Sequence, residues 1–333
     1  MKSSSSSILT LSAIVSLAVV GQSAFAGNIF SDDFSSSTVN VAPVAPTSTS
    51  TSYEIASTKN APAASMSTGN FSFGLPSTSS AFVEAQALFP SVTLGSVGDY
   101  VNLNFVFTDT SGILGGSGTS ATLNVGLYDS GGVAPLTGLD QSGLSSATTY
   151  NTGGAQLWQG YMGRVFQSGT AGIYTRNQQN AVTDGTGNDN NGNQDLLFTG
   201  AGTGTYKNPT GTSLGTAASA LALTGGNQYT VNYRITSSAA GQYTIAYDLY
   251  DGVGTGGTDL WSQSVTTSTI LTSTFSGMAI GWRYSGVSSD PASTMDVNSL
   301  TIDAVSSVPE PASMAIFGFG VLGMVLGYRR VRR

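Results

Sequence analysis

The feature that most constrains the fold is an alternation of apolar and polar residues with a period of two. In YVNLNFVFTDT, residues 100–110, every second side chain from Val101 to Phe107 is apolar. The same pattern returns at residues 121–129, 228–236 and 242–252. This period is typical of β-strands that bury one face and expose the other, and no helical period of similar strength stands beside it.

Further strands are predicted at 82–89, 155–166, 172–176, 195–198, 259–265, 275–284 and 299–305. The loop SSAAG, residues 237–241, joins two alternating segments and carries Gly241 where a tight turn needs it, so a hairpin is expected there. Many short strands with glycine-rich connections indicate an all-β, antiparallel jelly-roll sandwich, which we assign to a single domain over residues 27–305. The Pro/Ser/Thr tract at 41–52 fits either a linker or an extended edge segment.

Composition excludes several functional classes. The chain has no cysteine and no histidine, so it forms no disulfides and cannot use Ser-His-Asp or Cys-His catalysis. Between Asn28 and Val305 stand 17 acidic residues and six basic ones, a net charge of −11. Such a surface repels phosphate backbones, and nucleic acid is therefore not an expected partner.

The N-terminus has the pattern of a secretory signal peptide. Lys2 and a serine run precede an uncharged stretch from Ile8 to Val20, and small residues stand at Ala24 and Ala26. This order predicts a signal helix over residues 1–26 that directs the chain to the secretion machinery. Signal peptidase is expected to cleave the chain after Ala26.

The C-terminal tail, residues 306–333, is predicted to be a targeting segment rather than part of the fold. Residues 311–328 carry no charge and, as a helix, would extend about 27 Å, enough to cross most of a bilayer. Pro309 and Pro311 stop the preceding strand. The basic residues that follow predict a cytoplasmic end, by the positive-inside rule, at Arg329, Arg330, Arg332 and Arg333.

This tail resembles the PEP-CTERM sorting domain. The resemblance rests on the motif Val308, Pro309, Glu310 and Pro311, followed by a short apolar segment and a basic cluster. It implies that exosortase, a membrane enzyme, recognises and processes the protein at the motif. It also implies that the protein is anchored transiently in the inner membrane. The protein would then be delivered to the cell surface or extracellular matrix of an exopolysaccharide-producing Gram-negative bacterium.

The body resembles concanavalin A-like, or laminin G-like, jelly-roll domains. The resemblance rests on FSDDF near the start, GDYVNLNFVF and NVGLYDSGG in the first half, and MAIGWRY with MDVNSLTIDAV at the end. Related glucanases use carboxylates from one Glu-x-Asp-x-x-Glu strand, which is missing here. The body between residues 27 and 305 contains only two glutamates, Glu54 and Glu84, which stand 30 positions apart. We therefore expect no enzymatic activity.

No cofactor is expected, with one candidate exception. The segment DGTGNDNNGNQD gathers oxygen ligands of the kind that calcium prefers, with Asp184, Asp189 and Asp195 as candidate ligands of a structural Ca²⁺. Its spacing departs from that of an EF-hand loop, and ordinary Asn/Asp/Gly turns are the alternative.

Aromatic residues are the remaining candidates for a binding site. Trp158, Tyr161 and Trp261 are candidates for stacking on sugars, together with Trp282 and Tyr284, whereas burial in the sandwich core is the alternative.

The sequence leaves two main hypotheses for the function of the protein. The first is a non-catalytic surface or matrix protein, and the second is a lectin-like module that binds exopolysaccharide; a glycoside hydrolase is a distant third.

Overall fold

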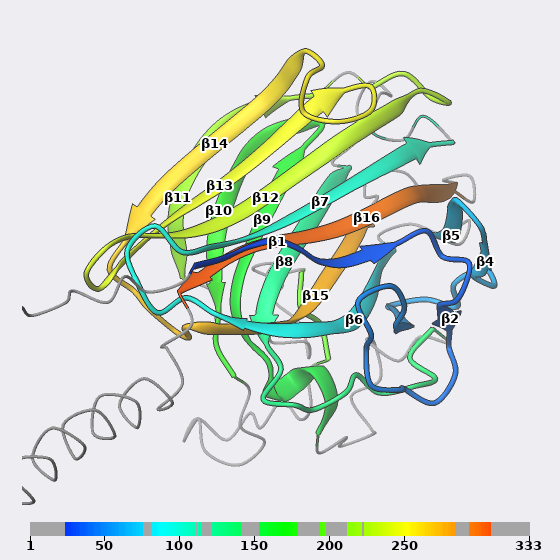
Figure 1. The fold of residues 1–333 in the computed structure, drawn as a ribbon. Coiled ribbons are helices and arrows are strands. Elements are labelled where there is room, and N and C mark those ends of the chain that lie inside the picture. The colour runs from blue at the N-terminus through cyan, green and yellow to red at the C-terminus, as the bar shows by residue number, and fades with distance from the viewer. Residues whose placement is uncertain are drawn as a thin grey trace, which may run out of the picture. The chain divides into compact units, whose positions relative to one another are not determined.

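The computed structural model describes residues 24–75, 81–110, 112, 114, 121–140, 153–178, 194–197, 212–221, 223–283 and 293–307. Within them, Ala24–Ser307 forms one compact unit, a sandwich of two eight-stranded sheets (Figure 1). The all-β sandwich predicted from the alternation is therefore confirmed. The expected signal helix and the apolar segment 311–328 lie outside the described residues, among which no helix is long and apolar enough to cross a membrane.

The first sheet, sheet A, has the order β14-β13-β12-β7-β16-β5-β4, with β1 also paired to β16. Its strands are β1 (Ala24–Asp32), β4 (Ser65–Ser67), β5 (Asn70–Leu75), β7 (Tyr100–Asp109), β12 (Gln228–Ala239), β13 (Gln242–Asp251), β14 (Asp259–Thr267) and β16 (Ser293–Ser307). The first and last strands of the domain are neighbours, since Gly27 pairs with Ala304 and Asp32 with Leu300 (Figure 1).

The second sheet, sheet B, has the order β11-β10-β9-β8-β15-β6-β3-β2. Its strands are β2 (Thr38–Val39), β3 (Ser52–Ser57), β6 (Phe82–Thr93), β8 (Thr122–Asp129), β9 (Gln159–Phe166), β10 (Ser168–Arg176), β11 (Ser213–Ala220) and β15 (Thr274–Arg283). All strand pairs of both sheets are antiparallel except β2 with β3, which is parallel. A short 3-10 helix, η2 (Gly154–Leu157), precedes β9.

The main core lies between the two sheets and is built by the predicted alternation. Val101, Leu103 and Phe105 of β7 face inward, as do Val83 of β6 and Val125 of β8. The predicted hairpin is also confirmed, because β12 and β13 pair along their length and Gly241 takes a positive φ of 70° in the turn.

Two expectations about elements were wrong. Residues 195–197 of the predicted strand 195–198 are in no strand, and the start of 155–166 belongs to η2 rather than to β9. The compact unit Ala24–Ser307 contains the predicted domain 27–305, with β1 beginning at Ala24 and β16 ending at Ser307. Sequence patterning marks the middle of a strand better than its ends, where pairing rather than alternation decides.

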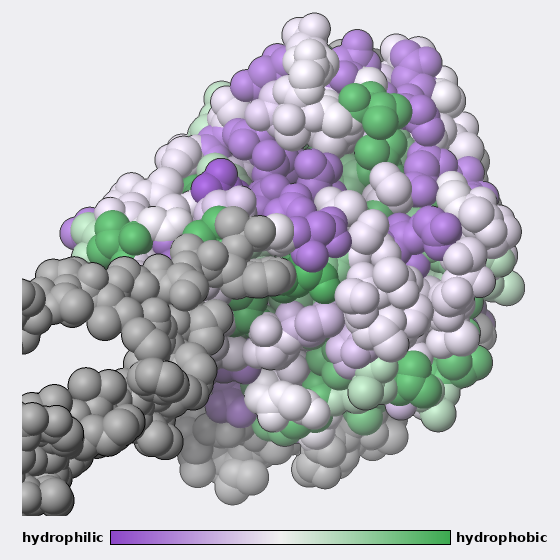
Figure 2. Space-filling view, in the orientation of Figure 1, coloured by the Kyte–Doolittle hydropathy of each residue, from purple (hydrophilic) through white to green (hydrophobic). Residues whose placement is uncertain are grey.

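The surface in Figure 2 is mostly hydrophilic or near neutral, with small separate hydrophobic patches. Large apolar side chains that are exposed come from separate loops and strand ends: Val41, Val44, Val97, Val253, Leu260 and Ile270. Scattered apolar residues of this kind are normal for a folded domain and define no binding surface.

Candidate functional site

The richest arrangement of polar side chains lies on the side of sheet B that faces away from the main core, here called the outer face. In β6, Val83, Ala85 and Ala87 enter the core while Glu84 and Gln86 alternate with them and point the other way. The same alternation in the neighbouring strands places Asn124, Tyr128, Arg164, Arg176 and Arg283 on the outer face.

Strand register brings these side chains together from distant parts of the sequence. One row across the sheet runs through Glu84, Gly281, Asn124 and Arg164. The next row contains Glu54, which stands opposite Gln86. Glu54 and Glu84, 30 positions apart in sequence, are therefore diagonal neighbours on adjacent strands, a proximity that spacing alone did not reveal.

Small residues on β15 let other groups approach the sheet closely. A Cβ atom on Gly277 would lie 2.7 Å from the ring of Trp158, and one on Gly281 would lie 2.9 Å from Cβ of Glu84. The Trp158 ring therefore packs directly on the backbone of β15. It belongs to a second, smaller apolar cluster on the outer face: Tyr128, Ala155, Trp158, Met162, Leu196, Leu197 and Ala279.

The described residues Gln194–Leu197 lie across the outer face and are here called the strap. It forms no helix or strand, yet side chains of β6 and β8 bind its backbone. Its carbonyl groups accept hydrogen bonds from Gln86 Nε2, Tyr128 OH and Asn124 Nδ2 at 2.6, 2.7 and 3.1 Å. The polar side chains of the outer face thus replace the strand partner that the strap lacks.

Glu84 supplies the matching acceptors. Its Oε1 accepts the N–H of Leu196 at 2.9 Å, and its Oε2 accepts the N–H of Leu197 at 3.1 Å. The side chain is fully buried. Burial, followed by the charge of Asp195, raises the pKa of Glu84 well above its usual value, while hydrogen bonds from Gln86 and Leu196 oppose the shift.

Arg176 is the cation of this cluster and is also fully buried. Its guanidinium donates hydrogen bonds to the backbone carbonyl groups of Trp158, Gln156 and Asp195. Burial lowers its pKa to about 10, although Tyr128, Asp195 and Glu84 act in the opposite direction. Arg176 therefore ties η2 and the strap to β10.

Glu54 is the polar residue that the described structure satisfies least. It is 0% exposed, and neither of its carboxylate oxygens has a hydrogen-bond partner. Burial, with the nearby charge of Asp140, raises its pKa to about 7. A buried carboxylate without donors is costly when charged, so the neutral form is favoured below that pH.

The aromatic residues proposed for sugar stacking lie in the interior instead. Trp158 and Tyr161 are 0% exposed and Trp261 is 9% exposed, so their ring faces are not available to a dissolved sugar. Their polar atoms donate to the carbonyl groups of Val133, Thr269 and Ala218. The stacking assignment is therefore corrected: large rings are buried because that removes most apolar area from water.

Trp282 is buried with Met278 and Ile280 in the main core. This is the alternative to sugar stacking that the sequence also allowed. Tyr284 lies outside the described residues.

Two of the three candidate calcium ligands, Asp184 and Asp189, lie outside the described residues. The third, Asp195, is buried in the strap, where its Oδ1 accepts the N–H of Leu197 at 3.0 Å. Within the described ranges, no group of three or more acidic residues is arranged to hold a metal ion.

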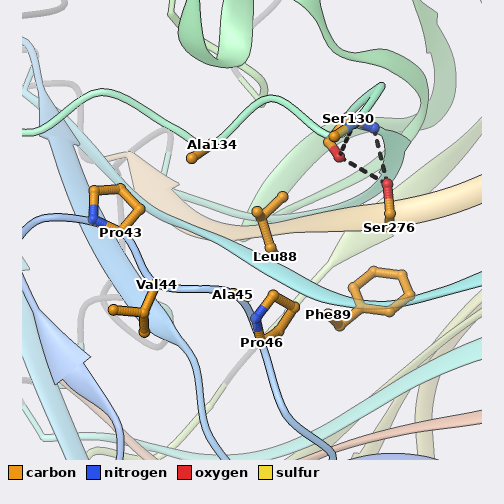
Figure 3. A pocket seen from close by; sticks show the side chains of 10 residues that line it. Pro43, Val44, Ala45, Pro46, Leu88, Phe89, Ser130, Ala134 and Ser276 are labelled. Carbon is orange, nitrogen blue, oxygen red and sulfur yellow. Dashed lines mark hydrogen bonds between the residues drawn. The ribbon is translucent and has the colours of Figure 1, made fainter.

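An apolar groove of about 370 Å³ lies beside the outer face, and the Pro/Ser/Thr tract forms one of its walls (Figure 3). Pro43 and Pro46 face Leu88 across it, and the hydroxyl groups of Ser130 and Ser276 are hydrogen bonded at 2.7 Å at one end. Part of the tract is thus extended chain packed against the domain rather than a free linker.

Comparison with known proteins gives one match to a family model and several distant structural likenesses. No similar curated protein was found. Solved structures with a similar β-sandwich include an endo-1,3-beta-glucanase from Streptomyces sioyaensis, at 11% identity and a TM-score of 0.40, covering 84% of this chain and 96% of that one.

Another is lectin II from Ulex europaeus, at 14% identity and a TM-score of 0.36, covering 76% of this chain and 92% of that one. The Lotus tetragonolobus seed lectin has 11% identity and a TM-score of 0.37, covering 78% and 94%. Scores this low carry no argument about what the present domain does.

The family match concerns the C-terminal tail. The model described as the PEP-CTERM protein-sorting motif matches residues 307–333, beginning at the last residue of β16. The match includes the predicted motif Val308 to Pro311 and all four terminal arginines. Such a motif implies export, processing by exosortase and a membrane-anchored C-terminal sorting signal. The chain therefore carries a PEP-CTERM protein-sorting motif directly after its β-sandwich domain.

Proposed function

We propose that this chain is an exported, non-catalytic protein of the cell surface or extracellular matrix, delivered through its C-terminal motif in a Gram-negative bacterium. The observation that carries the proposal is the boundary at Ser307: the sandwich ends there, and the sorting motif starts there. The sorting motif and the β-sandwich domain are consecutive segments of the chain. A protease can therefore cut at the motif without cutting a strand in its middle.

The state of the two glutamates of the body supports a non-catalytic role. A general acid or nucleophile must reach the bond it acts on. Glu54 and Glu84 are both 0% exposed, and the carboxylate of Glu84 is occupied by the backbone of the strap. Release of reducing sugar from any polysaccharide by the purified full chain, lost in Glu84→Gln, would contradict this proposal.

Mass spectrometry of the protein isolated from native cells tests the route. We expect an N-terminus at Gly27 and a C-terminus within or next to residues 308–311. A mature protein that still ends in Arg333 would contradict processing at the motif.

Carbohydrate binding is the second candidate, and side chains other than the buried tryptophans favour it. Phe82, Phe166 and Tyr174 are half-buried on the outer face. The Cζ atom of Arg164 lies 4.8 Å from the ring centroid of Phe166 and 5.0 Å from that of Tyr174. Partly exposed aromatic rings beside fixed polar donors suit sugars, which have both apolar faces and hydroxyl groups.

A glycan array probed with the full-length chain in detergent separates the two candidates. Saturable binding that is weakened by Phe166→Ala supports carbohydrate binding. A blank array favours a purely structural role.

A further inference from the structure

One edge strand of sheet A is open to pairing with another strand. β14 stands at the end of the sheet, with β13 as its partner on one side (Figure 1). After a bulge near its start, β14 pairs regularly with β13 from Trp261 to Thr267. Apart from this ladder, the described part of the chain makes no backbone–backbone hydrogen bond with residues 261–267. The N–H and C=O groups that face away from β13 therefore form a template for a further strand.

The other strand edges of the sandwich are protected. β4 and β2 have only three and two residues. β1 contains a bulge, and the N–H of Ser31 donates to the carbonyl group of Ser48 in the Pro/Ser/Thr tract at 2.8 Å. In β11, the carbonyl group of Ala218 accepts a hydrogen bond from Trp261 Nε1 at 3.2 Å. Short strands, bulges and covering groups prevent edge pairing, as do charged residues and proline, yet residues 261–267 contain neither charge nor proline.

The side chains of this stretch are only partly covered. Ser262, Ser264 and Thr266 are exposed on the solvent side of sheet A. On the other side of the strand, Val265 packs against the main core but stays half-buried, as does Gln263. A strand added beside β14 would cover these half-buried side chains and pair the free backbone groups at the same time.

The charge of the molecule favours a like copy as the partner at this edge. The body has a net charge of −11, so two copies repel each other over most of their surface. The stretch 261–267 is uncharged, and Asp259 precedes it. In the rows that cross this stretch, the nearest charged side chains are Asp248, one strand inward, and Arg234, two strands inward. Two acidic copies can therefore meet here with little repulsion, whereas a basic partner would be drawn to the acidic surface elsewhere.

We propose that β14 pairs with the β14 strand of a second copy of this chain, antiparallel and about a two-fold axis beside Ser264. Ser264 is the middle residue of the stretch 261–267, so it faces its own counterpart, and Gln263 faces Val265 of the other copy. This register places no like charges opposite each other. It joins the two A sheets into one continuous sheet and closes at a dimer, because each copy uses the same edge.

The contact is small, which sets the strength expected of it. A paired stretch of this length extends about 24 Å, less than the interface of a stable dimer requires. Association is therefore expected at high protein concentration, such as that on a crowded cell surface. The inference rests on the structural role proposed above and supplies a way for copies of the protein to associate there.

Sedimentation of the full-length chain in detergent, over a range of concentrations, tests the pairing. Ser264→Lys and Ser264→Asp each place like charges opposite each other, so each variant should self-associate about fivefold more weakly than the unmodified chain. An equimolar mixture of the two variants should associate at least as strongly as the unmodified chain, because lysine then faces aspartate. Ser264 is exposed, and a melting curve for each variant checks the fold.

Ser65→Lys is the matched control, because Ser65 is an exposed serine on β4, at the opposite edge of sheet A. This variant should associate as the unmodified chain does. A second measurement introduces no charge. The chain has no cysteine, so Ser264→Cys and Ser65→Cys each carry a single thiol. A short bifunctional maleimide should link Ser264→Cys chains into dimers and leave Ser65→Cys chains mostly monomeric.

Three results in sedimentation would overturn the pairing: a chain that stays monomeric up to millimolar concentration, equal effects of Ser264→Lys and Ser65→Lys, or growth beyond the dimer. Equal cross-linking of the two cysteine variants would overturn it as well. Each of these results leaves delivery through the sorting motif intact, since mass spectrometry of the native protein tests that route separately.

Discussion

At the scale of single residues, the two glutamates of the body show opposite ways of burying a carboxyl group. Glu84 receives hydrogen bonds from Gln86 and from two backbone N–H groups of the strap. Glu54 receives none, although it is equally buried. Desolvation penalises the charge of both, and for Glu54 nothing in the described structure offsets that penalty.

Glu54 should therefore make stability depend on pH. Its pKa rises from 4.5 in the unfolded chain to about 7 in the folded one, so the folded state holds its proton over a wider range. Stability is then fully present below pH 4.5 and falls as the pH rises toward and through 7.

The variant Glu54→Gln should remove this dependence and be more stable than the unmodified protein at pH 8, by about 1–3 kcal/mol, the usual penalty for an unsatisfied buried group. Urea denaturation at pH 5 and pH 8 measures the effect. A loss of stability between the two pH values that is as large in Glu54→Gln as in the parent would contradict this assignment.

Gly277 allows a second prediction at this scale. A methyl group there would meet three ring atoms of Trp158, at 2.7, 2.8 and 3.1 Å, so Gly277→Ala should cost about 1–3 kcal/mol as an overpacked site. Gly256→Ala is the control, because a Cβ at Gly256 meets nothing within 4 Å. Thermal unfolding followed by tryptophan fluorescence compares the two, and equal melting temperatures would argue against the close ring contact.

At the scale of elements, alternation predicted the strands that have a strong apolar face and failed elsewhere. β7, β12 and β13 were recognised because each buries apolar side chains at every second position. β11 was missed, since SLGTAASA has small side chains and lies at an edge of sheet B.

The segment 195–198 was mistaken for a strand because its leucines are indeed buried, but they contact the second apolar cluster rather than a sheet neighbour. Candidate site residues were harder to predict than strands. The neighbours of Arg283, for example, are set by register between strands that are about 160 positions apart.

β1 gives a prediction for this scale. The predicted cleavage after Ala26 would remove three residues from β1 and leave Gly27–Asp32 paired with β16. A chain that begins at Gly27 should therefore unfold at nearly the same temperature as one that begins at Ala24.

A chain that begins at Asp33 should lose about 3 kcal/mol or more, because it lacks Phe30, which is 0% exposed, and Asp32, which accepts hydrogen bonds from Ser37 and Tyr53. Scanning calorimetry of the three chains measures this series. Equal melting temperatures for all three would show that β1 adds nothing to sheet A.

At the scale of the whole molecule, the β-sandwich domain and the two terminal segments differ in net charge. The full chain has a net charge of −7, but residues 28–305 alone carry −11, because five cations (Lys2 and the four terminal arginines) and one acid, Glu310, lie outside them. Loss of both terminal segments should make the protein markedly more acidic. On anion exchange, the protein from native cells should elute at higher salt than the unprocessed chain produced without exosortase, and co-elution of the two would indicate that the arginines are retained.

The position of β16 has a consequence for the order of events during export. β16 is the last strand in the sequence, yet it stands inside sheet A, with β7 on one side and both β1 and β5 on the other. Sheet A cannot close until residues 293–307 are free to pair, so its first strand must wait for its last. For a chain exported unfolded, as the secretory signal pattern predicts, we therefore expect the fold to be completed only after the last strand before the sorting motif has crossed the membrane.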